Sequence, residues 1–493
     1  MDSEIELKLI LPPQLTDLLI KTIKNYPGAT SQATRQLSNQ YFDSATLVLR
    51  QNLMGLRVRT SDNFCEQTLK TAGKVIGGIH SRPEYNVPIE QKTPDLTLFP
   101  NDIWPDTVDI TLLNAQLECV FETNFTRQTW HIYIDDSLVE VAFDHGQVIA
   151  SEQHEPICEV ELELLAGDTS ALLQLATEFA KDVPMRLGKA SKAQRGYILA
   201  GKTQPLSIEH IDYICLPTDK SLDKTLTTLL ETGLERWQLI ESVLIETDDI
   251  AQQTALWSQL LSCVRLLKLT LNQFGLLSQH VASLFAELEQ DLAFIPTMQA
   301  QNLILENDAH MLSKLGEKSK IVVMIEHQVA LQHYAQRLTD LWQKPQYGQL
   351  QLALVELLLK TTNGQHQLVD YPQLGLFANH LQQDSWQRIV DAMPIKADMS
   401  SLDYQHVAQA LDESILVGFA YGELYLSQER ESFRAPWQDL ALGIQTLTAY
   451  QCLRESLIDT DIDIGTWLDN KESSLVFAME HSRKSALKEK PYW

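Results

Sequence analysis

Charged and apolar residues alternate along three short segments of this chain. Residues 4–8 read Glu-Ile-Glu-Leu-Lys, residues 57–59 place a valine between two arginines, and residues 159–163 read Glu-Val-Glu-Leu-Glu. Because successive side chains of a strand point to opposite faces, each segment predicts a strand with one charged and one apolar face. The apolar faces need a cover, which we expect from helices of the same half of the chain.

The charged faces are the more informative ones. One solvated face is the usual explanation of such alternation, but a solvated face tends to mix lysine, threonine, serine and glutamine. Like charges two residues apart repel each other unless a charge of opposite sign lies between them. A divalent cation between the glutamates and an anion between the arginines would supply that charge, since Mg²⁺ takes oxygen ligands and arginine matches phosphate oxygens. The pattern predicts a metal–polyphosphate site held by side chains, because no GxxxxGK[ST] loop occurs.

The two parts of the chain follow different periodicities. Up to about residue 200, short alternating segments between turn residues predict strands over 4–11, 37–43, 55–60, 65–70, 84–89, 117–128, 130–135, 138–149 and 157–165, with helices near 13–26, 169–182 and 190–199. From about residue 220, apolar residues at steps of three and four predict helices over 221–246, 251–274, 277–292, 321–343, 347–361, 403–430, 436–458 and 472–488. We therefore expect an α+β domain over 1–200, a linker over 201–219 and an all-α domain over 220–493, with Pro436 at a helix boundary.

Composition excludes several classes of protein. The chain of 493 residues has 39 Lys+Arg and 65 Asp+Glu, a net charge of −26, which argues against nucleic acid or an anionic membrane as its partner. With 44% hydrophobic residues it is an ordinary globular chain and not a disordered one. It has no apolar run of about 18 residues and no basic, apolar leader, so we expect no membrane span and no secretory signal. The six cysteines are scattered without metal-site spacing, which favours a reduced, cytoplasmic protein.

An ordered set of charged motifs runs through the first 200 residues. After the ExExK pattern of 4–8 come NQYFD at 39–43, GLRVR at 55–59, TLK at 68–70, RPEYN at 82–86, Arg127, Asp144, EVELE at 159–163, Lys189 and SKAQRG at 191–196. This set resembles the CYTH domain of the triphosphate tunnel metalloenzymes, a family that includes class IV adenylate cyclases, thiamine triphosphatases and bacterial inorganic triphosphatases. The resemblance implies an eight-stranded antiparallel barrel, open as a tunnel, whose charged faces point inward. Small barrels ordinarily fill their interior with apolar side chains.

The second half resembles the CHAD domain, a module of two repeats of the four-helix-bundle type whose histidines and basic residues bind polyphosphate. At 256–268, where that family carries a histidine and an arginine-rich stretch, this chain has Arg265 and Lys268 and no histidine. The whole chain, with its closing residues 490–493, resembles bacterial inorganic triphosphatases of CYTH–CHAD architecture. That resemblance implies hydrolysis of tripolyphosphate to pyrophosphate and phosphate.

The resemblance also implies roles for the charged residues. One Mg²⁺ or Mn²⁺ would lie between Glu4, Glu6, Glu159 and Glu161, and a second, held with help from Asp144 or Glu163, would position the attacking water. The triphosphate would be clamped by Lys8, Arg57, Arg59, Lys70, Arg127 and Lys189. Glu84 either faces the tunnel, next to the substrate, or caps the neighbourhood of Arg82.

Two other functions stay open on the sequence alone. The same tunnel would serve hydrolysis or cyclisation of an organic triphosphate such as thiamine triphosphate or ATP, or it would bind polyphosphate as a non-catalytic sensor or scaffold. The helical half is larger than catalysis requires, so it is a candidate for self-association or for binding a protein partner. Near its end, Arg483 and Lys484 are interpreted as part of a solvated helix end.

Overall fold

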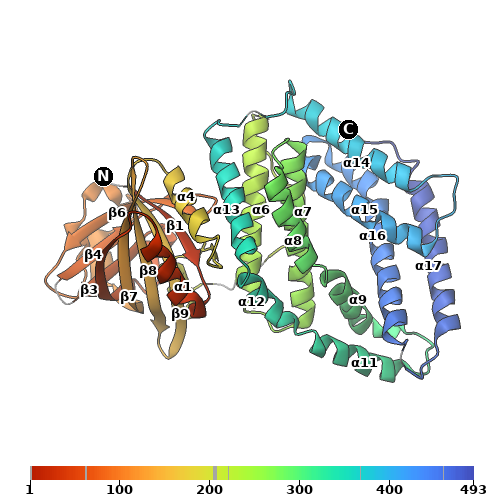
Figure 1. Ribbon diagram of the computed structural model, residues 1–493, viewed down its shortest axis with the longest axis horizontal. Coiled ribbons are helices and arrows are strands. Elements are labelled where there is room, and N and C mark those ends of the chain that lie inside the picture. The colour runs from red at the N-terminus through yellow and green to blue at the C-terminus, as the bar shows by residue number, and fades with distance from the viewer. Residues whose placement is uncertain (1–2, 62–63, 204–207, 220, 367, 459) are drawn as a thin grey trace. The chain divides into compact units, whose positions relative to one another are not determined.

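The chain folds into two compact units. The computed structural model describes residues 3–61, 64–203, 208–219, 221–366, 368–458 and 460–493 (Figure 1). The first unit, here called the barrel unit, comprises Met1–Ser207 and Trp342–Leu359, and the second, the helical unit, comprises Ile208–Leu341 and Lys360–Trp493. The segment expected as a linker, 201–219, is thus shared between the units, and most of helix α13 (Pro345–Thr362) is assigned to the barrel unit.

Eight strands of the described residues close into an antiparallel barrel, which confirms the predicted fold. Around the barrel the order is β1 (Ser3–Ile10), β9 (Gln153–Ala166), β8 (Ser137–Ala150), β7 (Glu118–Ile134), β2 (Thr30–Asp43), β3 (Gly55–Ser61), β4 (Phe64–Lys70) and β6 (Ile79–Pro88). Pairing of β6 with β1 completes the ring, because Glu4 lies opposite Arg82 and Glu6 lies opposite His80. Two short strands, β5 (Lys74–Ile76) and β10 (Arg186–Leu187), pair with β6 and β1 at the margins.

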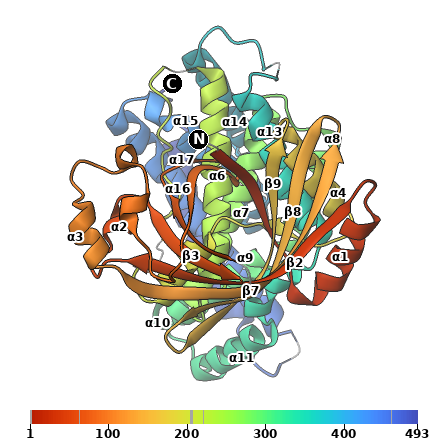
Figure 2. The ribbon, with the colours of Figure 1, turned by 90° about the vertical axis from the view of Figure 1, so that its left-hand side faces the viewer.

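The apolar faces of the strands point outward and are covered by helices and loops. Leu7 and Val160 are fully buried, and α4 (Ser170–Phe179) packs on β1, β8 and β9. Helix α1 (Thr16–Asn25), preceded by the 3₁₀ turn η1 (Pro13–Leu15), packs on α4. On another side, Leu56 and Leu69 pack with the segment that holds η2 (Leu96–Leu98), η3 (Asn101–Ile103) and α3 (Ile110–Ala115). In Figure 2, α1 lies at one side of the barrel and α2 (Val48–Gln51) and α3 lie at the other.

Helix α5 (Lys192–Leu199) is seated on apolar side chains of the barrel. Its N-cap Ser191 accepts a hydrogen bond from the Gln194 backbone at 3.1 Å, which fixes where the helix begins. Tyr197 packs edge-on against Phe121, with ring centroids 5.3 Å apart, and its hydroxyl donates to Asp43 at 3.0 Å. Gly196 lies so close to the Phe121 ring that a Cβ there would be 2.0 Å from it. These contacts fix the position of Lys192, the first residue of the helix.

The second half of the described chain is all helical, as predicted. Its helices are α6 (Leu222–Leu244), α7 (Ile250–Gln273), α8 (Gln279–Asp291), α9 (Ile295–Glu306), α10 (Asp308–Met311), α11 (Lys318–Leu331), α12 (Arg337–Trp342), α13, α14 (Leu374–Ala392), α15 (Ser401–Tyr421), α16 (Ser427–Ser456) and α17 (Gly465–Ala486), with 3₁₀ turns η4 (Tyr334–Gln336) and η5 (Gly422–Leu424). Within the helical unit α7 packs on α6, α9 and α15, and α16 packs on α9, α15 and α17. None of the described helices is long and apolar enough to cross a membrane.

Several helix boundaries differ from the expected ones. Pro436 lies inside α16 and does not end a helix, because Phe433 and Trp437 on either side of it are held in a hydrophobic core. The stretch expected as one helix over 321–343 is divided by the η4 turn, where His333 adopts a left-handed backbone conformation with φ 49°. Helices α9 and α14 were not expected at all.

The interpretation of Arg483 as solvated is wrong. This residue, in the last turn of α17, is fully buried. Its guanidinium donates to both carboxylate oxygens of Glu480, at 2.8 and 2.7 Å, and to the carbonyls of Pro394 and Ala397, at 2.7 and 2.8 Å. The chain after α14 therefore lies over the end of α17 and supplies the acceptors that make burial of this charge favourable.

Candidate active site

The inward faces of the strands line a cavity of about 1280 Å³ in the barrel unit. Ten of the residues predicted for the site lie on its wall: Glu4, Glu6, Lys8, Arg57, Arg59, Lys70, Glu84, Arg127, Glu161 and Glu163. Asp144 and Glu159 lie behind the wall, at 0% and 1% exposure, and contact wall residues. Lys189 is not among the residues that line this cavity.

Three buried acids form what we call the carboxylate cluster: Asp144 on β8, and Glu159 and Glu161 on β9. Each offers an oxygen atom within 4.8 Å of the others, and this is the one such acidic group that the described residues contain. Oxygen donors at this spacing suit a divalent cation. The cluster, however, is already filled with cationic side chains.

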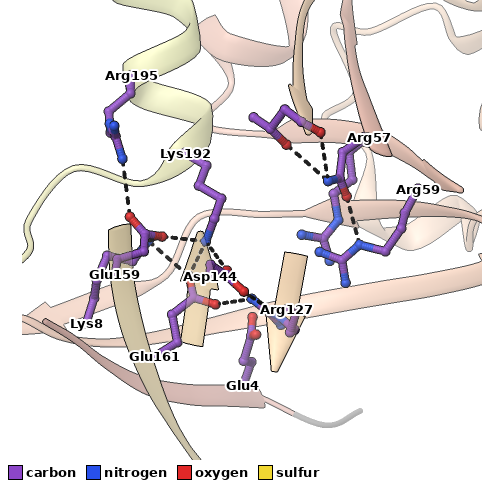
Figure 3. Close-up of polar contacts among 12 residues, drawn as sticks. Glu4, Lys8, Arg57, Arg59, Arg127, Asp144, Glu159, Glu161, Lys192 and Arg195 are labelled. Atoms are coloured by element: carbon purple, nitrogen blue, oxygen red, sulfur yellow. Dashed lines mark hydrogen bonds and ion pairs between the residues drawn. The ribbon is translucent and has the colours of Figure 1, made fainter. Parts of the chain in front are cut away.

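Four cations contact the carboxylate cluster (Figure 3). Lys8 lies 3.2 Å from Glu159 and 3.1 Å from Glu161. Arg127 binds Asp144 through two hydrogen bonds of 2.7 Å and also contacts Glu161. Lys192, reaching in from α5, lies 2.7 Å from Asp144 and 2.9 Å from Glu161 and also contacts Glu159. Arg195, one helical turn later, reaches Glu159 at 3.3 Å.

The mutual attraction in this cluster outweighs the cost of burial. Although burial alone would raise it, the charges of Lys192 and Lys8 hold the pKa of Glu161 well below its usual range. Burial likewise opposes charging of Lys192, yet Asp144, Glu159 and Glu161 raise its pKa. Glu161 and Lys192 are therefore both charged at neutral pH, and the cluster is a network of buried ion pairs.

Three further acids lie side by side on neighbouring strands and form what we call the carboxylate row. Glu163 on β9 is directly opposite Glu6 on β1 and Glu140 on β8. None of the three forms an ion pair with a lysine or arginine in the described part of the chain; Glu140 lies 3.1 Å from His131. Burial, followed by the charges of Glu140 and Glu6, raises the pKa of Glu163 to about 7. Like charges directly opposite each other on paired strands repel, so this row is deficient in cations.

Glu84 lines the cavity, the first of the two positions expected for it. Its carboxylate lies 3.2 Å from Arg57 and 2.7 Å from Lys70, and Lys70 also contacts Glu4. Although burial opposes it, the charges of Arg57 and Lys70 hold the pKa of Glu84 below its usual range. Burial, opposed by Lys70 and assisted by a hydrogen bond to Glu84, raises the pKa of Glu4 to about 8.

Arg59 is a cation without a carboxylate partner in the described residues. The amide of Asn39 holds its Nε at 2.7 Å. Burial, and then the nearby charges of Arg57 and Arg127, lower the pKa of Arg59 to about 9. A guanidinium held against two others in this way leaves strong hydrogen-bond donors available for an anion.

Sequence reasoning missed some residues at the wall. Lys192 follows the N-cap serine of α5, a signal that the sequence contains, but the lysine three residues earlier was chosen instead. Strand β6 also alternates, and His80, Arg82, Glu84 and Asn86 all line the cavity, although only Glu84 was proposed. His80 is 6% exposed and its Nε2 has no partner. Burial, and then Lys8 and Arg82, lower its pKa to about 4.

Known proteins are similar to both parts of the chain. The family model of the CYTH domain matches residues 2–197. The inorganic triphosphatase of Haemophilus influenzae is 38% identical over 207 residues, 41% of this chain and 56% of that protein, so this chain spans just over half the length of the relative. Among solved structures, the CHAD domain of Ricinus communis matches at TM-score 0.45 and 15% identity over 58% of this chain and 98% of its own. The PH1819 protein of Pyrococcus horikoshii matches at TM-score 0.27 and 16% identity over 39% of this chain and 97% of its own.

The sequence match and the geometry of the barrel agree. The matched range includes all eight strands of the closed barrel and ends within α5, whose lysine contacts the carboxylate cluster. The motifs expected on inward faces lie at the cavity wall. Residues 2–197 of this chain match the family model of the CYTH domain, and the barrel that they form carries the expected charged faces at its cavity.

Proposed function

We propose that the barrel unit hydrolyses inorganic triphosphate, releasing phosphate, with the help of a divalent metal ion. The observation that carries this proposal is Arg59, held beside Arg57 and Arg127 at the cavity wall without a carboxylate of its own. Positive charges gathered in this way are stabilised by a ligand that carries several negative charges, and tripolyphosphate is such a ligand. A relative at 38% identity, described as an inorganic triphosphatase, supports the same substrate.

Two of the three aromatic side chains at the wall, Tyr41 and Tyr197, are already covered by other side chains, which supports an inorganic over an organic substrate. An organic triphosphate needs a free ring or apolar platform for its base. Tyr41 already stacks on Phe121, with centroids 4.4 Å apart. Tyr197 is covered by Arg50 at 4.5 Å. Two of the wall's aromatic rings therefore have partners on their faces.

In this proposal the acidic residues hold the metal and the basic residues bind the substrate. A divalent metal would supply positive charge beside the phosphate oxygens, and glutamates of the cavity wall such as Glu4, Glu6 and Glu163 would supply oxygen donors to hold it. Arg57 and Arg59 bind the phosphate oxygens, and Lys70, tied to Glu4 and Glu84, keeps its charge beside them. Lys8 and Arg127 stay within the carboxylate cluster and extend the positive field toward the substrate. Fixed charges in a site with little water stabilise charge that shifts during phosphoryl transfer.

Phosphate release tests this proposal. The full chain is incubated with tripolyphosphate, ATP or thiamine triphosphate and Mg²⁺ or Mn²⁺, beside Arg59→Gln and a control, Arg388→Gln, whose arginine is 55% exposed on α14. We expect metal-dependent turnover that prefers tripolyphosphate, with kcat/KM about 100-fold lower in Arg59→Gln and unchanged in the control.

Other results decide between the alternatives. Preference for ATP or thiamine triphosphate would show that the substrate is an organic triphosphate, while the proposed role of the tunnel in triphosphate hydrolysis would stand. Tight binding of tripolyphosphate without turnover would overturn the proposal that the protein is an enzyme and would indicate a non-catalytic sensor. An Arg59→Gln variant as active as the control would remove the observation on which the proposal stands.

A further inference from the structure

Helix α13 belongs to the barrel unit, although it comes from the helical half of the sequence. Residues 342–359 are grouped with the barrel. On this helix Val355 and Leu358 are fully buried and lie beside Gly77, in the turn between β5 and β6, where an added Cβ would be 3.0 Å from Val355. The barrel unit therefore includes a helix from outside residues 1–200, the range expected for this domain.

Two glutamines of α13 bond the backbone of the chain that follows α4. The side-chain oxygen of Gln351 accepts a hydrogen bond from the Leu187 amide at 2.9 Å, and both groups are buried. The side-chain nitrogen of Gln349 donates to the carbonyl of Ala180 at 2.8 Å. Buried backbone groups need such partners, so these two amides stabilise the path of the chain at this place.

Residues just before Leu187 are also held by this part of the chain. Gly348 lies so near Met185 that a Cβ there would be 1.7 Å from the Met185 carbonyl oxygen. The guanidinium of Arg186 lies 3.8 Å from the centre of the Trp342 ring, at the end of α12, which is a cation–π contact. Three consecutive residues, 185–187, are therefore each in contact with a residue between 342 and 351.

The segment held in this way leads directly to two lysines of the carboxylate cluster. Leu187 lies on β10, which pairs with β1, and the next amide, that of Gly188, donates to the carbonyl of Lys8 at 2.9 Å. A Cβ at Gly188 would be 2.8 Å from Cγ of Lys8. Lys192 follows four residues later along the chain. The backbone at 185–188 therefore connects α13 with both lysines.

Helix α5 is anchored to the barrel toward one end and joined to this segment at the other. Tyr197 packs on Phe121 and bonds Asp43, whereas Lys192 is the first residue of the helix. A shift of the segment before α5 would move the Lys192 ammonium away from carboxylate oxygens that it now contacts at 2.7 and 2.9 Å. Charge-assisted hydrogen bonds weaken quickly when such distances grow.

We propose that Gln351 and Gly348 of α13 are positioning residues of the tunnel: by holding the backbone at 185–187, they set where Lys8 and Lys192 meet the carboxylate cluster. The helical half of the sequence thereby contributes to the tunnel itself. This inference goes beyond the proposed function and does not rest on it, because it concerns the placement of the two lysines and not the reaction.

The reactivity of Lys192 toward an acylating reagent tests the inference on the full chain. The protein is labelled briefly with a limiting amount of acetic anhydride, and peptide mass spectrometry gives the rate at Lys192 relative to the exposed Lys24 on α1. We expect Gln351→Met to raise this ratio about tenfold, because one hydrogen bond fewer opposes opening of the cluster. The matched control is Gln382→Met: Gln382 is 3% exposed on α14 and also bonds the backbone, but lies in the helical unit, so the ratio should change less than about twofold.

A second variant reaches the same segment by another route. Gly348→Ala should raise the ratio as well, since its Cβ displaces Met185 and leaves Gln351 in place, whereas Gly375→Ala, with nothing within 4 Å of its Cβ, should not. Circular dichroism shows whether each variant is folded, and Gln351→Met decides the matter if Gly348→Ala does not fold.

Hydrogen exchange at the Leu187 amide shows whether its bond to α13 has been lost. Faster exchange at Leu187 with unchanged reactivity of Lys192 would overturn the inference, as would an equal rise of that reactivity in Gln351→Met and Gln382→Met. Phosphate release is measured separately. Lysine reactivity as expected, without turnover by the unmodified chain, would overturn the proposed function alone.

Discussion

Asn39 keeps Arg59 available for an anion. The amide is fully buried, its oxygen accepts from Arg59 Nε at 2.7 Å, and its nitrogen donates to Thr123 Oγ1 at 3.0 Å. An amide orients the guanidinium without neutralising it, whereas a carboxylate at the same place would do both. Asparagine at this position, in place of aspartate, therefore orients Arg59 and leaves its positive charge available.

We expect Asn39→Asp to bind tripolyphosphate about 100-fold more weakly than the unmodified chain, because the new carboxylate competes with the substrate for Arg59. Asn39→Ala should lose only about tenfold, since Arg59 keeps its charge and loses its orientation. Calorimetric titration with tripolyphosphate measures both affinities. An aspartate variant that binds as tightly as the alanine variant would contradict this account of Arg59.

Alternation in the sequence predicted inward charges on three strands, whereas Lys70, Arg127 and Glu84 were implied by the family resemblance. It placed Glu4, Glu6 and Lys8 on one face, and their strand indeed lines the cavity. It did not reveal which charges meet, because partners such as Glu6 and Glu163 lie on different strands and depend on their register. Nor did it single out Lys192, whose importance comes from where α5 is seated.

At the scale of elements, α5 depends on the absence of a side chain at Gly196. We expect Gly196→Val to push the helix away from Phe121, because its Cβ would lie 2.0 Å from that ring. The free energy of unfolding should fall by about 1–3 kcal/mol, as in other overpacked sites. Denaturant unfolding followed by fluorescence measures it. Gly375→Ala, at a position with nothing within 4 Å of the new Cβ, is the control and should not be destabilised; equal loss in both variants would exclude a role of the contact.

Helix α17 gives a prediction for pH. Although burial opposes it, hydrogen bonds from Arg483 and Tyr404 lower the pKa of Glu480 to about 2. Its contribution to stability is therefore fully present above its unfolded pKa, near 4.5, and is lost as pH falls from there toward 2. We expect Glu480→Gln to lose on the order of 3 kcal/mol at pH 7 and progressively less toward pH 2, measured by denaturant unfolding. Glu489→Gln, exposed three residues past α17, should show no loss; a loss in Glu480→Gln that stays constant with pH would contradict the ion pair.

Elements were predicted best where periodicity is strong and local. The stretch that became α7 was placed to within a residue or so, because its apolar residues recur regularly. Helix α14 was missed, since several of its buried positions are polar, among them Gln382 and Ser385, which bond the helical unit's own backbone. Pro436 and Arg483 were misjudged because tertiary packing, absent from a sequence window, compensates for a missing amide hydrogen and a buried charge.

At the scale of the whole molecule, no described cysteine is cross-linked. All six, in both units, are free thiols. We therefore expect dithiothreitol to leave the thermal unfolding of the freshly purified chain unchanged, as differential scanning calorimetry will show. A lower melting temperature after reduction would reveal a disulfide and contradict the thiols seen here.

Closure of the barrel and the extent of each unit are properties of the whole molecule, because both depend on contacts between distant parts of the chain. The strand at residues 3–10 pairs with residues 79–83 on one side and 159–163 on the other. Nothing in a local pattern indicates such distant pairing, so the barrel was inferred from family resemblance and not from periodicity. The assignment of residues 342–359 to the barrel unit was likewise not foreseen, because it depends on contacts across the chain.

Along the strands of the barrel, residues that pack in the hydrophobic core alternate with residues that face the cavity. Leu7 faces outward and packs in the core, while its neighbours Glu6 and Lys8 line the cavity. The lining is therefore exchangeable in principle without repacking the hydrophobic core, provided that charges are exchanged in balanced sets. Evolution of a new substrate preference in such a scaffold is then a matter of compensated charge swaps, in which two or three inward positions change together and single changes are selected against.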